Sequence, residues 1–239
     1  MFDLDGTLVE INQRILARGL LLAGARRFAT VVPPWRFRST YGSALAAARA
    51  NTTDRTNHEV FLLHLMERTC RPERIQFLMK EFAAGDLGRL QTAFTPVPGA
   101  RETLAAARAL GYELVLATNP LWPLAAVRLR LRRAGLEDIR FRFISHSEVS
   151  TRCKPSADYY RELMHHSRVS ASECVMIGND PDRDAAATQL GIKTFLLAQD
   201  GRRQVTSAGN DPILAIGTLP DLLEWLVACR LARAPGVVN

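Results

Sequence analysis

The first eight residues place two carboxylates at a spacing that suits chemistry. The chain opens Met-Phe-Asp-Leu-Asp-Gly-Thr-Leu, so one apolar residue separates Asp3 from Asp5. If this segment ends a strand, the two acids share a face, because alternate strand residues point the same way. Carboxylates held so close repel each other, which favours a bound cation or a shared proton. The glycine that follows permits a sharp turn, but D-x-D-G alone is equally typical of an ordinary turn or helix cap.

Further polar residues lie just after the predicted strands or in the loop before a predicted helix. They are Thr118, Asn119, Lys154, Asp180 and Asp184. Ligands of parallel sheets bind beyond the carboxyl ends of the strands, so we expect these side chains at one edge with the two N-terminal acids. Together they offer carboxylates for a hard cation, and a hydroxyl, an amide and an ammonium for phosphate oxygens. This is the polarity of a phosphoryl-transfer site, although each residue alone is also typical of a loop or a solvated charge.

The elements that must position these residues alternate between strand and helix after a boundary at residues 96–99. The predicted strands are 113–117, 141–145, 174–177 and 193–197. The predicted helices are 101–110, 124–134, 157–166, 184–190 and 219–231. Such alternation with short glycine turns predicts an α/β fold, a Rossmann-like parallel sheet covered by helices on both faces.

Residues 11–95 have a different texture. Apolar residues recur there at helical spacing, and no stretch makes a convincing strand. Pro33-Pro34 and Gly85-Asp86 read as breaks, while Thr53-Asp54 and Pro72-Glu73 are plausible helix starts. The segment is therefore predicted to be a small helical module.

Composition limits the class of protein. The 239 residues are 47% hydrophobic and 23% charged, as in ordinary globular chains, and the length allows a sizeable core. The net charge of +7 comes mainly from arginines dispersed along the chain, which argues against a nucleic-acid partner. The four cysteines form no C-x-x-C pair, so we expect buried thiols rather than zinc. Because signal-peptide and membrane-spanning patterns are missing, we expect a cytoplasmic protein without a membrane partner.

The order of the polar groups resembles the haloacid dehalogenase superfamily, in its phosphatase-like branch. The four matching motifs are residues 2–7, 114–119, 154–155 and 177–184. The resemblance implies that residues 11–95 form a helical cap domain inserted between the first two motifs. Residues 1–10 and 96–239 then form the Rossmann-like catalytic core.

By this resemblance, Asp3 is the nucleophile that forms an aspartyl-phosphate intermediate, which water then hydrolyses. Asp5 is the general acid for the leaving alcohol and then the base for water. Dehalogenase members lack an acid at the second position, since a halide leaves without a proton. The presence of Asp5 therefore favours phosphoryl transfer over dehalogenation.

The resemblance also implies two sets of ligands. The phosphate-binding residues are expected to be Thr118, Asn119 and Lys154. The Mg²⁺ ligands are expected to be Asp3, Asp5 through its main-chain carbonyl, Asp180 and Asp184. The expected function is a Mg²⁺-dependent phosphatase of a small phosphorylated metabolite.

Two alternatives stay open. A phosphomutase keeps the same acids. An inactive phosphate-binding protein would result if the central first strand, with only Met1 and Phe2 before Asp3, were too short to hold the acids.

The cap is expected to select the substrate, but the sequence assigns no cap residue to the site. A solvated surface is the simplest interpretation for its polar residues Arg14, Arg18, Arg49, Asn57 and His58. The oligomeric state is not predicted.

Overall fold

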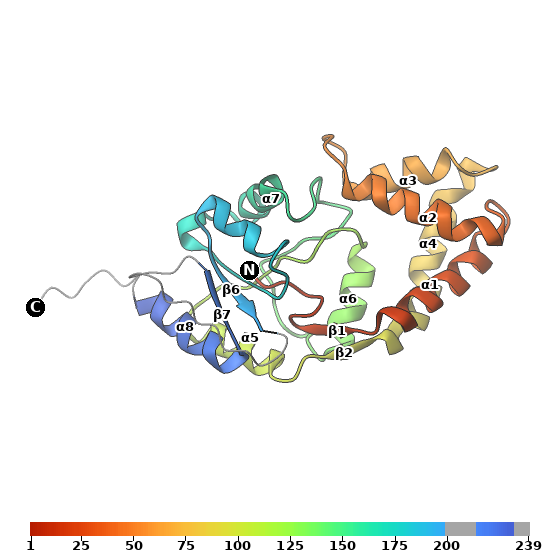
Figure 1. The fold of residues 1–239 in the computed structure, drawn as a ribbon. Helices are drawn as coiled ribbons and strands as arrows, with labels where there is room; N and C mark the ends of the chain where they lie inside the picture. Colours follow the sequence, from red (N-terminus) through yellow and green to blue (C-terminus); the bar gives the residue numbers. More distant parts are fainter. Residues whose placement is uncertain (199–213, 232–239) are drawn as a thin grey trace, which may run out of the picture.

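A parallel sheet organises the larger part of the molecule (Figure 1). The computed structural model describes residues 1–198 and 214–231. Its strands are β3 (Val115–Leu116), β4 (Phe143–Ile144), β5 (Val175–Gly178), β6 (Lys193–Leu197) and β7 (Leu214–Gly217). Phe2 forms parallel bridges to Leu116 and to Ile177, so residues 1–3 lie between β3 and β5. The order across the sheet is therefore β4, β3, residues 1–3, β5, β6 and β7.

The short first strand is hydrogen-bonded on both sides. The Phe2 N–H donates to the Val115 carbonyl at 2.8 Å, and the Asp3 N–H donates to the Ile177 carbonyl at 2.8 Å. The Phe2 carbonyl accepts from the Ala117 N–H at 2.7 Å. Bonds to both neighbours fix the position of Asp3 at the end of the strand.

Side chains alternate between two apolar layers, as the two-residue period of strands requires. On one face, the helix α7 (Ala157–Ser167) packs on Met1, Val115, Ala117 and Met176. On the other face, the helices α5 (Ala100–Ala109) and α8 (Leu219–Leu231) pack on Phe2, Leu116, Ile177 and Phe195. Helices therefore cover both faces of the sheet (Figure 1), which confirms the predicted α/β fold.

Most predicted core elements are present with bounds shifted by at most two residues, and the helix α6 (Leu124–Arg133) is one of them. The segment 184–190 differs, because it forms the 3₁₀ helix η5 (Ala185–Leu190) instead of an α-helix. The Asp184 carboxylate turns back onto the preceding loop and makes no cap hydrogen bond to its own helix. The strand β7 and the 3₁₀ helix η4 (Ala171–Glu173) were not predicted. Residues 199–213 and 232–239 of the predicted core lie outside the described residues.

The helices between residues 13 and 93 form a separate block, hereafter the helical block, beside the core (Figure 1). Its α-helices are α1 (Gln13–Arg27), α2 (Pro34–Arg49), α3 (Asn57–Met66) and α4 (Ile75–Glu81). The shorter η1 (Pro72–Arg74), η2 (Phe82–Asp86) and η3 (Leu87–Ala93) complete it. Buried aromatic rings hold the helices together, with centroids 5.6 Å apart for Phe28 and Phe37 and 5.2 Å apart for Tyr41 and Phe61.

Two strands connect the helical block to the core, so the expectation of no strand in residues 11–95 is wrong at both ends. The strand β1 (Val9–Ile11) pairs antiparallel with β2 (Phe94–Pro96), and Glu10 lies opposite Thr95. Three residues are too few to show a period in the sequence. The polypeptide therefore enters and leaves the helical block side by side.

No disulfide joins the four cysteines, of which Cys153, Cys174 and Cys229 are buried. Cys70 is exposed, contrary to expectation, because it lies in the surface loop between α3 and η1. Among the described residues, no helix has the length and apolar character needed to cross a bilayer.

The crossing of α1 and α2 gives a test of the packing in the helical block. A Cβ atom at Gly24 would overlap the Phe37 ring, whereas one at Gly42 would meet nothing within 4 Å. We predict that Gly24→Ala lowers the free energy of unfolding by about 1–2 kcal/mol despite its better helix propensity. The control Gly42→Ala should raise it by about 0.5–1 kcal/mol. Urea unfolding of both variants checks this, and equal stability of the two would contradict the packing.

Candidate active site

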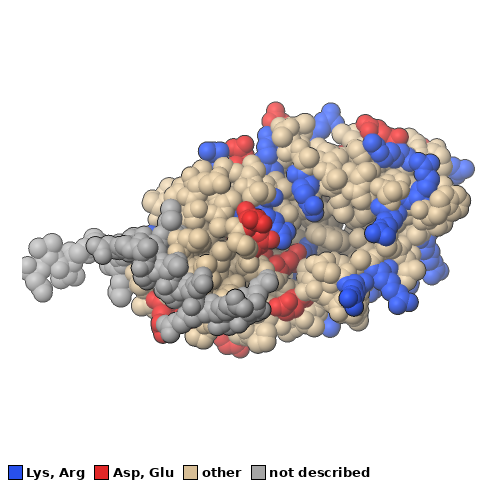
Figure 2. All heavy atoms as spheres, viewed as in Figure 1, with Lys and Arg blue, Asp and Glu red and all other residues tan. Residues whose placement is uncertain are grey.

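A cavity of about 270 Å³ opens at the edge of the sheet where residues 1–3 and β5 end. Its acidic residues are Asp3, Asp5, Glu10, Asp180 and Asp184, and its basic residues are Lys154 and Arg183. Asn119 also lines it, so the structure brings six of the seven predicted site residues to one cavity. In the space-filling view, the surface is hollowed between the core and the helical block, with both acidic and basic side chains around the hollow (Figure 2).

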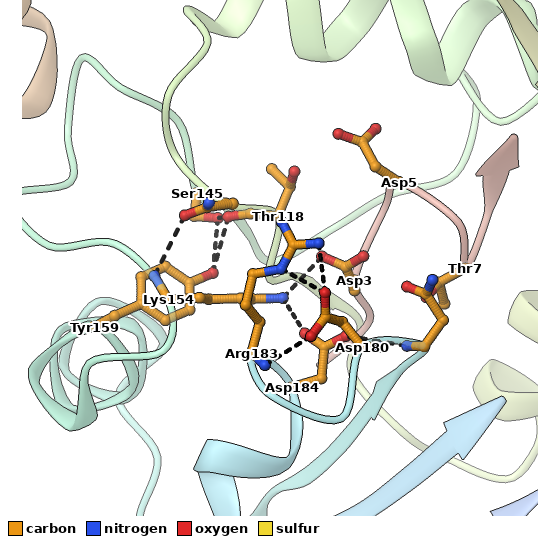
Figure 3. A network of polar contacts seen from close by, with 12 residues as sticks. Asp3, Asp5, Thr7, Thr118, Ser145, Lys154, Tyr159, Asp180, Arg183 and Asp184 are labelled. Atoms are coloured by element: carbon orange, nitrogen blue, oxygen red, sulfur yellow. Dashed lines mark hydrogen bonds and ion pairs between the residues drawn. The ribbon is translucent and has the colours of Figure 1, made fainter. Parts of the chain in front are cut away.

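Lys154 joins two of the acids at the bottom of the cavity (Figure 3). Its Nζ lies 2.8 Å from Asp3 Oδ1 and 2.5 Å from Asp184 Oδ1. All three side chains are buried. One ammonium thus serves two carboxylates, so the cluster carries a net negative charge when Asp3 is ionised, and burial strengthens these interactions.

Burial and charge act in opposite directions on this cluster. Burial raises the pKa of Asp3 to about 7, although the Lys154 ammonium lowers it. Burial disfavours the charged form of Lys154, but the carboxylates of Asp3 and Asp184 outweigh it and hold the pKa of Lys154 well above its usual value. The lysine is therefore charged, while Asp3 ionises less readily than an exposed carboxylic acid.

The loop after β5 wraps around Asp184. The Asp184 Oδ2 atom accepts hydrogen bonds from the N–H groups of Asn179 and Asp180, both at 3.0 Å. Gly178 makes room for this contact, since a Cβ atom there would overlap the Asp184 carboxylate. Asp184 therefore fixes both the lysine and the backbone of the loop.

Asp180 has partners within its own turn. Its Oδ2 accepts from Arg183 Nε at 2.6 Å, and its Oδ1 accepts from the N–H groups of Asp182 and Arg183 at 3.0 and 2.9 Å. Although partial burial opposes the shift, the Arg183 hydrogen bond holds the pKa of Asp180 below its usual value. The Asp180 carboxylate is therefore ionised, and both of its oxygens already accept hydrogen bonds from its own turn.

The predicted metal site can be compared with these contacts. The carboxylates around the cavity are the donors that a hard divalent cation prefers, and the net charge of the Lys154 cluster favours one. Within residues 1–198 and 214–231, however, no three His, Cys, Asp or Glu side chains converge closely enough to hold an ion. Asp180, one of the residues that would hold the ion, is already engaged by Arg183. The carboxylate donors are of the type that Mg²⁺ prefers, and the assignment of individual Mg²⁺ ligands stays a prediction.

Thr118 follows Ala117, whose N–H is hydrogen-bonded to the Phe2 carbonyl, but it does not line the cavity. Its carbonyl accepts hydrogen bonds from Ser145 Oγ at 2.6 Å and from the Tyr159 hydroxyl at 3.0 Å. Its own Oγ1 is buried and has no hydrogen-bond partner among the described residues. An orphaned buried hydroxyl needs an explanation, and a ligand oxygen is a suitable one.

Asp5 lines the same cavity as Asp3, as their spacing predicts, but it has a different partner (Figure 3). The chain leaves the strand after Leu4 and turns through Gly6, whose φ of 88° suits glycine. The Asp5 carboxylate instead accepts hydrogen bonds from Arg130 Nη1 at 2.8 and 2.6 Å. The two acids line one cavity but hold different partners.

Arg130 is the functional candidate that the sequence analysis missed. It lies on α6, is 2% exposed, and has its guanidinium 5.5 Å from the centre of the Trp122 ring. Its position three residues after Val127 places it on the buried face of that helix. A charged residue on an apolar helical face requires a partner, and this is the signal that could have identified it.

Comparisons with known proteins indicate the family to which the chain is similar. A family model described as haloacid dehalogenase-like hydrolase matches residues 1–191. The chain is 22% identical over 226 residues to pyrophosphatase PpaX of Halalkalibacterium halodurans, covering 94% of each chain. It is 27% identical over 238 residues to a phosphoglycolate phosphatase of Cupriavidus necator, covering 98% of this chain and 95% of that one.

A solved structure extends the likeness to the fold. The 2-haloacid dehalogenase of Pseudomonas syringae pv. Tomato DC3000 superposes with a TM-score of 0.59 at 22% identity. The match covers 95% of this chain and 96% of that chain. Its reaction is not carried over, because likeness at this identity shows the fold alone.

The pKa of Asp3 predicts a dependence of stability on pH. Because the pKa of Asp3 is raised from 3.8 to about 7 in the folded protein, Asp3 contributes to the free energy of unfolding fully below about pH 4. This contribution is lost as the pH rises through about 7. We predict that Asp3→Asn, without divalent metal, is more stable than the unaltered protein by about 2 kcal/mol near about pH 8, and that the gain shrinks towards about pH 4. Urea unfolding across this range checks it. The exposed Asp158→Asn serves as control, and a less stable Asp3→Asn at high pH contradicts it.

Replacement of Asp5 is expected to lower the stability of the protein, in contrast to replacement of Asp3. Asp5→Ala leaves the buried Arg130 guanidinium without its carboxylate. We therefore predict that it lowers the free energy of unfolding by about 3 kcal/mol. Arg130→Met added to Asp5→Ala should recover most of that loss, because the unpaired charge is removed. A double-mutant cycle by urea unfolding measures the coupling, and simple additivity would contradict a pairwise interaction.

Proposed function

The chain belongs to the haloacid dehalogenase-like hydrolases, and we propose that it is a Mg²⁺-dependent phosphatase of a small phosphorylated metabolite. The observation that carries the proposal is the buried Asp3, fixed by ladder hydrogen bonds and by Lys154 at the bottom of a cavity. The similarity to a pyrophosphatase and to a phosphoglycolate phosphatase supports a phosphate compound as substrate.

In the proposed reaction, an Asp3 carboxylate oxygen attacks phosphorus and the ester P–O bond breaks. The leaving oxygen takes a proton from Asp5, and Asp5 later removes a proton from the water that hydrolyses the aspartyl-phosphate. The observed contact with Arg130 requires the Asp5 side chain to rotate before it reaches a leaving group above Asp3. A proton donor at this position also favours phosphoryl transfer over dehalogenation.

Charge explains the remaining assignments. An anionic nucleophile that approaches an anionic phosphate needs positive charge and donors around the phosphoryl oxygens. Lys154, the Thr118 hydroxyl and the Asn119 backbone N–H are the proposed donors. Asp3, the Asp5 carbonyl, Asp180 and Asp184 are the proposed residues for Mg²⁺. When bound, this cation supplies the positive charge that one lysine between two carboxylates lacks.

Residues 11–95 are proposed to be the cap, with residues 1–10 and 96–239 as the core. Glu10 and Gln13 line the cavity, so the beginning of the helical block already borders the site. A cap in this place can exclude water and choose among leaving groups. The four cysteines without a disulfide support a cytoplasmic location, and dispersed arginines support a small-molecule substrate over a nucleic acid.

Activity tests the function directly. We predict that the protein releases phosphate from p-nitrophenyl phosphate, that a chelator abolishes the release, and that added Mg²⁺ restores it. Asp3→Asn should lower kcat by at least about 10³-fold, because no other carboxylate is held at the same point. Asp158→Asn, which changes an exposed carboxylate on α7, should keep full activity. Undiminished turnover by Asp3→Asn would remove Asp3 from the role of nucleophile.

A further inference from the structure

We propose that Asn57, a residue of the helical block, positions the two core loops that carry Thr118 and Lys154. The inference rests on the proposed function, because it concerns the loops that are assigned to the phosphoryl oxygens. If Asn57 has this role, the helical block both covers the proposed phosphate site and helps to position its loops.

Asn57 is fully buried where the helical block touches the core, although the sequence analysis interpreted it as a solvated residue. Its Nδ2 donates to the Pro120 carbonyl at 3.2 Å and to the Arg152 carbonyl at 3.3 Å. The same atom lies 3.5 Å from Cys153 Sγ. Its Oδ1 accepts from Asn51 Nδ2 at 3.1 Å, so both ends of the amide are used.

These acceptors belong to the two loops in question. Pro120 directly follows Asn119, and Cys153 directly precedes Lys154. The loops also touch each other, since the Lys154 N–H donates to Asn119 Oδ1 at 3.3 Å. The Asn57 amide therefore bridges the two loops. Without it, the buried Pro120 carbonyl and the partly buried Arg152 carbonyl lose this donor, and burial makes such a loss costly.

The beginning of α3 reinforces this bridge. The backbone N–H groups of Asn57 and His58 donate to the carbonyls of Ser150 and Ser147, both at 2.8 Å. The first N–H groups of a helix have no partner within the helix, and here core carbonyls supply one. Arg152 Nη1 reaches back to the Thr53 carbonyl at 2.6 Å. A displacement of the helical block that breaks these bonds also frees the segment before Lys154.

Thr56 supplies a matched control one residue away. Its hydroxyl accepts from the Glu59 N–H at 3.2 Å, and its own N–H donates to the Glu59 carboxylate at 2.8 Å. This capping box stabilises α3 without touching either loop. Thr56→Ala therefore weakens the same helix while leaving the Asn57 amide in place.

The test compares Asn57→Asp, Asn57→Ser and Thr56→Ala in the full chain. Asn57→Asp keeps the shape but turns a carboxylate towards two carbonyls, and Asn57→Ser carries the test if the first variant does not fold. Hydrogen exchange of residues 117–121 and 150–154 reports loop positioning without reference to activity. Inhibition by orthovanadate and the separate values of kcat and KM for p-nitrophenyl phosphate report the phosphate site.

We expect loop exchange at least about tenfold faster in the Asn57 variants, with weaker vanadate inhibition and lower kcat of about the same factor. Thr56→Ala should lower Tm but change loop exchange, vanadate inhibition and kcat by no more than about twofold. It removes a helix cap and leaves the contacts between Asn57 and the loops in place. Unchanged loop exchange in the Asn57 variants, or equal effects of Thr56→Ala, overturns the inference. An unaltered protein without phosphatase activity overturns the proposed function alone, since hydrogen exchange still decides whether Asn57 holds the loops.

Discussion

The arrangement of this molecule depends on one ammonium group shared by two buried carboxylates. Asp3 lies at the end of the first strand, Asp184 lies directly before η5 in the segment that follows β5, and the lysine comes from a loop between them in the chain. Each partner needs its own support. Ladder hydrogen bonds on both sides hold residues 1–3, and the missing side chain of Gly178 leaves space for Asp184. Because burial strengthens both the attraction and the cost of an unpaired charge, small displacements of any of these segments change the site strongly.

The sequence predicted the parts of this arrangement that follow from period and topology. Short apolar runs followed by polar residues indicated parallel strands, and a parallel sheet necessarily gathers the carboxyl ends of its strands at one edge. Asp3, Asn119 and Asp180 are far apart in the chain, yet they line one cavity for this reason. The motif order also indicated the family, which the family match confirms. The roles of the individual side chains stay predictions.

The directions and partners of side chains could not be read in the same way. The spacing of Asp3 and Asp5 implied a shared face, and both line the cavity, but the pairing of Asp5 with Arg130 was not predicted. Asn57 was interpreted as a surface residue because polar side chains are mostly exposed, but it is buried by a contact between two parts of the fold. Such pairings are set by tertiary packing, for which a local window carries no signal.

The ribbon of β1 and β2 has a consequence for how the molecule can change. Since Ile11 lies opposite Phe94, the helical block is a long insertion between two paired antiparallel strands, in the position of a hairpin loop. The entropic cost of closing a loop grows only with the logarithm of its length, so blocks of very different size can be carried by the same pair of strands. Insertions, deletions or replacement of the block leave the order of the parallel sheet untouched. The strand order of the core therefore does not depend on the size of the block that the two strands carry.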